Sequence, residues 1–524
     1  MGAPQSTIKI CSGTLLDNTY QNTIWFDSLE DQKEYFEGKV VKTFSSYSYL
    51  RRDWDIIVQA TMEQALSWTY LFFKNTDNGK TYYYFINKIQ YVSDGSVKLS
   101  IEMDVMQTYL FEHNLSRSFV EREHSATDEI GENLIDEGLD VGELVVNSYE
   151  LMTDLNELSI LMLSTLNPSE TTEETKVITR ASLLNGVFSG MGVYAVEKSD
   201  YSTLGNILAN LDEWGISDCV VSMWMYPKKL INTGSNEGTA KKVVSSLAYN
   251  YTIKRPSNIK GYTPRNKKLL TYPYCFAYVT NNEGGSAVYQ YEHFANPDSC
   301  QLRVGGSISP EGVMKCYPLS YKGANYNYDE GITLGGFPSC AWDADVYKLW
   351  LAQNQAQQGV ALGVAGATIA GGLLTTLFTG GMGAIGGVGA VAGGASQIAG
   401  LMAQKADMSV QPPQARGNFS SNVNIVEGFQ TFVVFNKTVD KAHAEMIDCF
   451  FDIYGYATKL VKIPNRNVRE NYTYTKTVGC NVYGNLCIDD LTKIKSIYDN
   501  GVTFWKQGDL IGNYGLSNNC LGGE

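Results

Sequence analysis

The feature that most constrains this chain is a long stretch without charged side chains. From Leu349 to Gln404, about 56 residues pass without Asp, Glu, Lys, Arg or His. That length would supply two bilayer spans of roughly 20 residues each. Glycine and alanine are interleaved with large apolar residues, and an apolar surface of this size drives association when it is left in water. The stretch must therefore be buried in an assembly or enter a membrane.

Three structural interpretations compete for this stretch. The first is a buried Gly/Ala-rich core or linker. The second is a constitutive transmembrane hairpin of Gly359–Thr379 and Met382–Ala403, but its many glycines lower helix propensity and make each span a marginal membrane segment. The third is a conditional segment that stays hidden until it is released into a membrane. Small residues four apart, such as Gly389 and Gly393, let membrane helices approach closely and suit the third interpretation.

A fourth interpretation is nucleotide binding. Gly381-Met-Gly383-Ala-Ile-Gly386 matches the dinucleotide fingerprint GxGxxG. A stretch this rich in glycine supplies such a match by chance, and no clear strand–turn–helix context surrounds it. The first acidic residue that follows is Asp407. Nucleotide binding is therefore the weakest of the four interpretations.

The conditional membrane segment is the hypothesis we carry forward. The residues expected to penetrate the membrane are its large apolar ones: Leu362, Val364, Ile369, Leu373, Leu374, Leu377, Phe378, Met382, Ile385, Val388, Val391, Ile398 and Leu401. Glycine loosens the backbone and a proline pair cannot continue a helix, which predicts hinges and turns. These hinge and turn positions are Gly359, Gly380, Gly381, Pro412 and Pro413.

Composition limits the remaining possibilities. The length of 524 residues allows two to four domains. A formal net charge of −14 argues against gripping nucleic acid through clustered Lys and Arg. The 34 tyrosines favour β structure and extended interfaces. The ten cysteines are scattered without a CxxC pair, which predicts buried thiols in a protein folded in a reducing cytoplasm. The first residues lack the pattern of a secretory signal.

Periodicity predicts a mainly β (α+β) chain. The expected strands are Ile56–Ala60, Trp68–Lys74, Lys80–Lys88, Val97–Ile101, Leu158–Leu163, Gly192–Val196, Gly215–Met225 and Phe432–Lys437. Helices are expected at Asp27–Gly38, Asp200–Trp214, Lys441–Tyr454 and Ile488–Asn500. The last helix should begin at Asp489 or Asp490 and end at Gly501. The acidic segment Val120–Leu144 is interpreted as a solvated connecting arm.

Catalytic patterns are missing from the sequence. The four histidines lie in no HExxH motif, and neither a nucleophile elbow nor a Walker loop is present. Glycosidases need only two carboxylates, and the sequence does not single out such a pair. We therefore expect no enzymatic activity, no cofactor and no metal.

Short motifs along the chain carry a resemblance to a known family. They are Glu102-Met-Asp104-Val-Met-Gln107-Thr108, Phe119-Val-Glu-Arg-Glu-His124, Ile135-Asp-Glu-Gly-Leu139, Tyr272-Pro-Tyr-Cys275, Gln404-Lys-Ala-Asp407, Pro412-Pro-Gln414, Tyr454-Gly-Tyr456, Tyr498-Asp-Asn-Gly501 with Trp505, and Ile511-Gly-Asn-Tyr514. In this order the chain resembles the tail knob, or distal tail tube, proteins of small phi-29-like podoviruses that infect Gram-positive bacteria. The resemblance is poor between about Asn147 and Leu269, where the chain looks shortened.

The resemblance implies a homo-hexameric ring of β-barrel-like tail-tube domains at the phage tail tip, made in the host cytoplasm. It implies that the hydrophobic loops plug the lumen, then leave it and form a pore in the host cytoplasmic membrane for genome ejection. Other tail proteins and double-stranded DNA, passing without sequence-specific binding, would be partners. The alternatives are a purely structural tube protein with a lumen-sealing loop and a receptor-binding tail protein.

The same resemblance suggests a division of the chain into five ranges. Residues 1–146 and 269–348 would form two parts of a β-rich tube domain, and 147–268 a smaller α/β or distal insertion. Residues 349–410 would be the glycine-rich membrane-active loop. Residues 411–524 would complete the tube scaffold as an α+β C-terminal part.

Overall fold

Strands dominate the described part of the chain, which confirms the mainly β prediction. The computed structural model describes residues 6–50, 54–76, 79–179, 182–184, 187–189, 191–197, 200–234, 238–282, 284–309, 313–324, 326–334, 339–341 and 431–522. The chain divides into two compact units, each assembled from separated pieces of sequence. Unit 1 consists of Met1–Glu143, Ser257–Tyr274 and Val439–Glu524, and unit 2 of Leu144–Pro256 and Cys275–Thr438. The five-range division stays a prediction.

The first sheet of unit 1 has seven strands in the order β3-β1-β6-β7-β8-β5-β4, and all its pairs are antiparallel. Its strands are β1 (Ile8–Ser12), β3 (Val40–Phe44), β4 (Ser48–Leu50), β5 (Asp55–Val58), β6 (Trp68–Lys74), β7 (Thr81–Ser93) and β8 (Ser96–Met103). The predicted bounds of β6 are confirmed. Strands β5, β7 and β8 were predicted with bounds that differ at one or both ends, because aromatic and β-branched residues suit a half-buried sheet but do not fix where a strand stops. No bounds were predicted for β1, β3 and β4.

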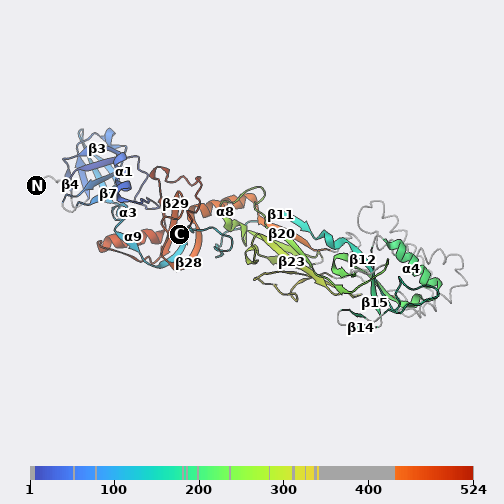
Figure 1. Ribbon diagram of the computed structural model, residues 1–524. Helices are drawn as coiled ribbons and strands as arrows, with labels where there is room; N and C mark the ends of the chain where they lie inside the picture. The colour runs from blue at the N-terminus through green and yellow to red at the C-terminus, as the bar shows by residue number, and fades with distance from the viewer. Residues whose placement is uncertain are drawn as a thin grey trace, which may run out of the picture. The chain divides into compact units, whose positions relative to one another are not determined.

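Helix α1 (Leu29–Gly38) packs on this sheet through an aromatic cluster (Figure 1). It begins after Ser28, whose hydroxyl accepts a hydrogen bond from the main-chain N–H of Asp31, as an N-cap should. Phe36 is fully buried, and its ring stacks on Tyr70 at a centroid distance of 5.1 Å. The predicted helix is therefore confirmed, and its apolar face is anchored by rings from the sheet.

The second sheet of unit 1 brings the two ends of the chain together. Its five strands lie in the order β2-β31-β29-β10-β28. They are β2 (Asn22–Ile24), β10 (Ser118–Glu123), β28 (Tyr456–Lys462), β29 (Tyr472–Val478) and β31 (Val502–Trp505). Strand β2 runs parallel to β31, and the remaining pairs are antiparallel. The two sheets share one buried core, in which Phe36 and Tyr70 join the same cluster as Val502 and Phe504.

Helices and a small strand pair complete unit 1. They are α2 (Met62–Ala65), α3 (Val105–Thr108), α8 (Lys441–Tyr454), α9 (Ile488–Asn500), and the pair β9 (His113–Leu115) with β30 (Val482–Gly484). The predicted bounds of α8 and α9 are confirmed, and Gly501 ends α9 with φ at 91°. The predicted cap of α9 was wrong. Cys487 is the N-cap residue, and Asp489 and Asp490 lie in the first turn, where carboxylates favour the helix dipole.

Unit 2 begins with a five-stranded sheet in the order β18-β15-β12-β16-β26. Its strands are β12 (Leu158–Ser164), β15 (Gly192–Glu197), β16 (Val220–Pro227), β18 (Lys241–Lys242) and β26 (Ser339–Ala341). Helix α4 (Tyr201–Glu213) covers one face of this sheet (Figure 1), where Leu204 and Leu211 pack with Ile160 and Met162. The predicted helix and the predicted strands Leu158–Leu163 and Gly192–Val196 are therefore confirmed within one or two residues. The predicted strand Gly215–Met225 was right only from Val220 onward, because Ser217–Cys219 form a 3-10 helix.

The remaining strands described in unit 2 form two four-stranded sheets and two strand pairs. The sheets have the orders β11-β27-β21-β22 and β20-β23-β24-β25. Their strands are β11 (Leu144–Leu151), β20 (Tyr249–Lys254), β21 (Cys275–Thr280), β22 (Ser286–Tyr289), β23 (Ser299–Gly306), β24 (Met314–Pro318), β25 (Ile332–Leu334) and β27 (Val433–Val439). The strand pairs are β13 (Ser182–Leu184) with β14 (Val187–Ser189) and β17 (Ile231–Asn232) with β19 (Ser245–Ser246).

The cysteine prediction holds for only part of the described chain. Six of the thiols are buried: Cys11, Cys219, Cys275, Cys300, Cys316 and Cys480. The prediction was wrong for Cys449 and Cys487, which are exposed. Cys449 lies on α8, and Cys487 immediately precedes α9. Helix surfaces and helix starts are open to solvent, and composition alone does not reveal that a particular cysteine will fall there.

We predict that Gly455→Ala destabilises unit 1. Gly455 follows α8 with φ at 62° and ψ at −151°, and an added Cβ would overlap the main-chain carbonyl of Glu123. A cost of about 1–3 kcal/mol in the free energy of unfolding is expected from such strain. Urea unfolding followed by tyrosine and tryptophan fluorescence measures it. Gly38→Ala is the control, because nothing lies within 4 Å of its added Cβ. Equal stability of the two variants would contradict the prediction.

Candidate functional site

The residues predicted from the sequence to carry the function lie outside the described residues. This holds for the thirteen apolar positions from Leu362 to Leu401 and for the hinge and turn positions Gly359, Gly380, Gly381, Pro412 and Pro413. Their roles stay predictions. Within the described ranges, no helix is both long and apolar enough to span a bilayer.

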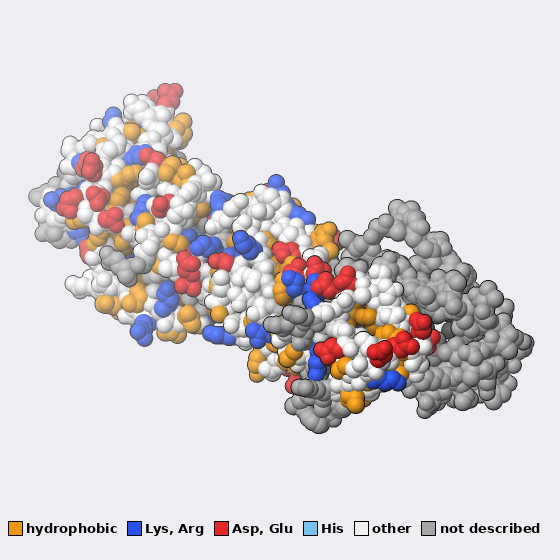
Figure 2. Space-filling view, turned by 45° about the vertical axis from the view of Figure 1, so that its right-hand side comes forward, with side chains coloured by type: hydrophobic (Ala, Val, Ile, Leu, Met, Phe, Trp, Pro, Cys, Tyr) orange, Lys and Arg blue, Asp and Glu red, His pale blue; other side chains and the backbone are white. Residues whose placement is uncertain are grey.

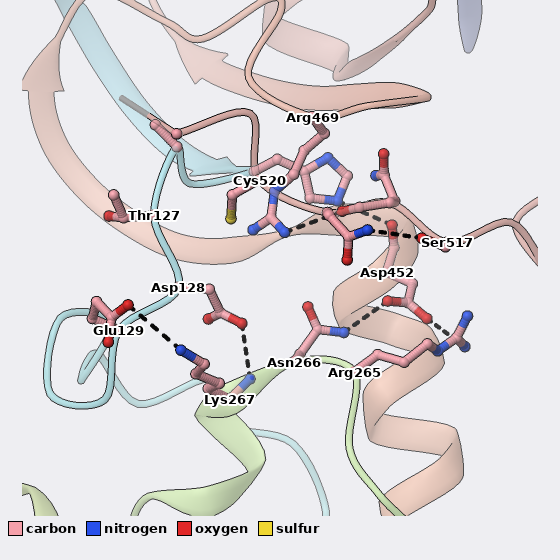
Figure 3. Close-up of a pocket in the computed structure, with 15 residues that line it drawn as sticks. Thr127, Asp128, Glu129, Arg265, Asn266, Lys267, Asp452, Arg469, Ser517 and Cys520 are labelled. Carbon is pink, nitrogen blue, oxygen red and sulfur yellow. Dashed lines mark hydrogen bonds and ion pairs between the residues drawn. The ribbon is translucent and has the colours of Figure 1, made fainter. Parts of the chain in front are cut away.

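The described residues do form a polar cavity in unit 1, with a volume of about 430 Å³. Figure 3 shows several parts of the chain meeting around it: the segment after β10, residues 265–267, Asp452 of α8, Arg469 and the C-terminal residues. Charged side chains of both signs line the cavity, among them Asp128, Lys267 and Arg469. Distant pieces of sequence therefore build one charged site.

Helix α8 holds the 265–267 loop through two buried carboxylates. Asp448 accepts hydrogen bonds from the main-chain N–H groups of Arg265 (2.7 Å) and Asn266 (3.0 Å) and from the hydroxyl of Tyr262 (2.7 Å). One turn later, Asp452 accepts a bond from the Asn266 amide at 2.7 Å and forms an ion pair with Arg265. Burial raises the pKa of Asp452 to about 6. Asp448 thus satisfies main-chain donors that would otherwise be buried without partners, and Asp452 holds the side chains of Arg265 and Asn266.

A second buried contact joins β10 to the 3-10 helix Lys267–Leu270, which continues from this loop. The carboxylate of Glu137 has no exposed surface, and it forms ion pairs with Arg122 of β10 and with Lys268. It also accepts a hydrogen bond from the main-chain N–H of Ala457 in β28, at 3.0 Å. Three separate chain segments therefore converge on one carboxylate. Such an arrangement is tolerated in a protein interior because the charge is fully paired and hydrogen-bonded.

His124, at the end of β10, is held in its neutral form by two main-chain groups. Its Nδ1 accepts a hydrogen bond from the N–H of Tyr474 at 2.8 Å, so the ring proton resides on Nε2. That Nε2–H donates to the carbonyl oxygen of Asp452 at 3.0 Å. Burial, followed by the charge of Arg469, lowers the pKa of His124 to about 3. His124 is therefore a structural crosslink rather than a proton carrier near neutral pH.

The C-terminal residues form one wall of the cavity by binding along Val468–Tyr472. The Asn518 side chain accepts from the N–H groups of Asn471 (3.0 Å) and Tyr472 (3.1 Å) and donates to the Tyr472 carbonyl (2.9 Å). The N–H of Glu470 donates to the carbonyl of Asn519 at 3.1 Å. The side chain of Arg469 donates to the carbonyls of Ser125 and Asn518. This wall is therefore bonded to β29 and to the segment after β10.

These contacts correct the prediction of a solvated arm at Val120–Leu144 for two of its carboxylates. Glu123 is 2% exposed, and the side chain of Glu137 is buried as described above, whereas Glu129, Glu132, Asp136, Asp140 and Glu143 are exposed as expected. The sequence does not reveal which carboxylates are buried, because their partners come from distant segments. One signal was present. The motifs that carried the family resemblance include Phe119–His124, Ile135–Leu139 and Tyr454–Tyr456, and all three contribute to this network.

The ion pairs and hydrogen bonds of the site favour a structural role, in which they hold chain segments together, rather than a catalytic one. In the described ranges, no group of three or more His, Cys, Asp and Glu side chains is placed to hold a metal ion. The carboxylates discussed above are committed to hydrogen bonds and ion pairs, and His124 has both ring nitrogens occupied. The expectation that the chain needs no cofactor stays a prediction.

Comparisons with known proteins agree with this structural role. A family model for the C-terminal domain of the tail knob protein gp9 of Bacillus phage phi29 matches residues 237–519. A model for the N-terminus of caudoviral major tail proteins matches residues 4–114. The chain is 26% identical to the tail knob protein gp9 of Bacillus phage B103 and 24% identical to that of phi29. Each alignment covers 98% of this chain and 98% of the relative.

The fold is also found in a solved structure. The tail knob protein gp12 of bacteriophage C1 matches with a TM-score of 0.68 at 16% sequence identity, over 98% of this chain and 100% of that chain. The fold and the family models therefore define a structural protein of a phage tail, a component of the virion. More specifically, the chain belongs to the family of the phi29 tail knob protein gp9, whose C-terminal model spans more than half of its length.

We predict that Glu137→Gln strongly destabilises unit 1. The variant leaves Arg122 and Lys268 beside a neutral amide in a buried site, and breaking one partner of such a contact costs about 3–5 kcal/mol in the free energy of unfolding. Glu121→Gln is the matched control. Its ion pair with Lys476, at 2.8 Å, is partly exposed and should contribute less than about 1 kcal/mol. Urea unfolding compares them, and similar losses for both variants would refute the assignment.

We predict that His124 makes unit 1 sensitive to acid. The unfolded chain binds a proton near the ordinary histidine pKa of about 6.5, whereas the folded pKa is about 3. The stability contributed by neutral His124 is therefore fully present above pH 6.5 and is lost as the pH falls toward 3. Between pH 7 and pH 5, the wild type should lose about 2 kcal/mol more than His124→Asn. Urea unfolding at several pH values tests this, and parallel profiles would contradict it.

Proposed function

We propose that this tail knob protein assembles as a homo-hexameric ring at the phage tail tip and encloses a conduit for double-stranded DNA. Its hydrophobic loops plug the lumen, then leave it and penetrate the host cytoplasmic membrane to form a pore for genome ejection. The observation that carries the proposal is the stretch Leu349–Gln404, which lacks any charged residue. A protein made in the host cytoplasm has to keep such a stretch out of water until it is used.

The connectivity of unit 2 supports a loop that is tethered at both ends. The chain enters residues 342–430 from β26, which pairs with β16 through Met223 and Cys340. It returns at β27, which pairs with β21 through Thr280 and Val433. The two ends of this long segment are thus built into sheets. A segment anchored in this way changes its environment by moving between its anchors, while the sheets keep their pairing.

The negative net charge of the chain favours passage of DNA over tight binding of DNA. Six copies with a formal charge of −14 would carry 6 × −14 = −84. On the face drawn in Figure 2, Lys and Arg side chains lie among Asp and Glu side chains rather than in one continuous basic band. A negatively charged surface repels phosphates and therefore does not hold DNA in place. Other tail proteins would complete the assembly.

Two alternatives differ in a measurable way. A purely structural tube protein would use Leu349–Gln404 only to seal its lumen, and the marginal hydrophobicity of a glycine-rich segment is consistent with that role. A receptor-binding tail protein would bind host cell walls without disturbing membranes. Release of dye from lipid vesicles by the purified, assembled protein is expected only from the proposed function.

We predict that a charge placed in the apolar stretch impairs membrane insertion. Leu374→Lys or Ile385→Lys should each weaken insertion by about 3 kcal/mol, the cost of a lysine at the centre of a membrane segment. Dye release from phospholipid vesicles measures the loss, and electron microscopy checks that assembly is unchanged. The control is Leu66→Lys, since Leu66 is 69% exposed in unit 1 and lies far from the stretch in sequence. Undiminished leakage by the first two variants would refute penetration through these positions.

A further inference from the structure

The cavity in unit 1 contains a buried cation, Arg469, that forms no ion pair with a carboxylate among the residues the structure describes. Arg469 is 6% exposed, and its Nε–H donates to the carbonyl of Ser125 at 3.0 Å. Its Nη1 donates to the carbonyl of Asn518 at 3.3 Å. Within the described part of the chain, no carboxylate oxygen lies within 4.0 Å of this guanidinium, and Nη2 makes no hydrogen bond. The N–H groups of Nη2 are therefore available to a bound group.

The other two cations of the cavity are arranged differently. Arg265 forms an ion pair with Asp452 and is committed to it. Lys267 is 48% exposed on its side chain, and its ammonium group lies 3.5 Å from Glu129, which is itself 70% exposed. Such an exposed contact contributes little and exchanges readily. The cavity thus combines a fixed buried guanidinium with an ammonium group that is able to move, on opposite sides in Figure 3.

Burying a charge without a partner of opposite charge is costly, and a bound anion beside Arg469 would reduce that cost. Carbonyl oxygens satisfy individual N–H groups, but they do not neutralise the charge of a desolvated guanidinium. A cavity of about 430 Å³ beside Arg469 leaves room for a counter-ion with several polar neighbours. A guanidinium presents its donors as a planar fork that matches a carboxylate. Among the described residues, the carboxylates that line the cavity pair with other groups, so a carboxylate in contact with Arg469 is what the site lacks.

The lining residues limit how much negative charge the cavity accepts. The formal charge of the lining is zero, because it contains three carboxylates and three cations: Asp128, Glu129 and Asp452, and Arg265, Lys267 and Arg469. A dianion such as phosphate would meet more repulsion from these three carboxylates than a monoanion would. We propose that the cavity is a binding site for a single carboxylate group, held by Arg469 with Lys267 closing over it. The carboxylate comes either from a free small acid or from an Asp or Glu side chain of a neighbouring copy.

The test uses the full-length protein at pH 7.5 and constant ionic strength. Sodium acetate, in place of sodium chloride, should raise the melting temperature in a saturable way, because a ligand that binds only the folded state stabilises it. Sodium phosphate should have a weaker effect at equal concentration. Arg469→Lys keeps the charge but loses the fork, and should weaken acetate binding by about tenfold. Equal effects of acetate and chloride on the wild type would overturn the proposal.

A second variant keeps the test decisive if Arg469→Lys does not fold. Lys267→Gln alters a half-exposed side chain, leaves the main-chain hydrogen bond from Lys267 to Asp128 in place, and should weaken acetate binding. Lys33→Gln is the matched control, since Lys33 is exposed on α1, and should bind acetate as the wild type does. Acetate binding that is identical in both variants would also overturn the proposal.

Sedimentation in the same buffers separates the two sources of the carboxylate. If a neighbouring copy supplies the group, acetate competes with it and shifts the protein toward smaller species, and Lys267→Gln shifts in the same direction without acetate. If the group belongs to a free acid, acetate binds while the sedimentation coefficient stays constant. Either result, together with saturable binding that depends on Lys267, supports the carboxylate site.

Discussion

Unit 1 depends on buried carboxylates that receive donors from distant parts of the chain. Glu137 joins β10, β28 and the segment that carries Lys268, and Asp448 on α8 fixes the main chain of Arg265 and Asn266. A buried carboxylate without partners is costly, so the segments that supply those partners have to come together. The short segment Ser257–Tyr274, which belongs to unit 1 while both its neighbours along the chain belong to unit 2, is held by these contacts.

The chain leaves unit 1 and returns to it twice, so unit 1 is built from three separate stretches of sequence. Hydrogen bonds to charged groups are stronger than neutral ones. The contacts of Glu137 and Asp448 therefore hold these stretches together within unit 1.

Local patterns predicted much of the fold. The bounds of β6, α8 and α9 were confirmed because alternating or helical periodicity and terminating residues such as Gly501 act within a few positions. The solvated arm was wrong for Glu123 and Glu137, because these two look like any other acidic residues until Lys462, Arg122 and Lys268 are placed beside them. The exposed thiols of Cys449 and Cys487 were missed for a similar reason, since exposure is a property of the packed surface.

The sequence by itself determined the longer helices and several of the strands, because their periodicity follows from the order of consecutive side chains. It also predicted that Leu349–Gln404 has to avoid water, because no charged side chain occurs there. The short sequence motifs alone also indicated the family of the chain. Only the tertiary structure decided which carboxylates are buried, that His124 is neutral and that Arg469 lines a cavity and donates to two main-chain carbonyls. These properties depend on contacts between residues far apart in the chain, and the energy of a charge is set by what surrounds it in space.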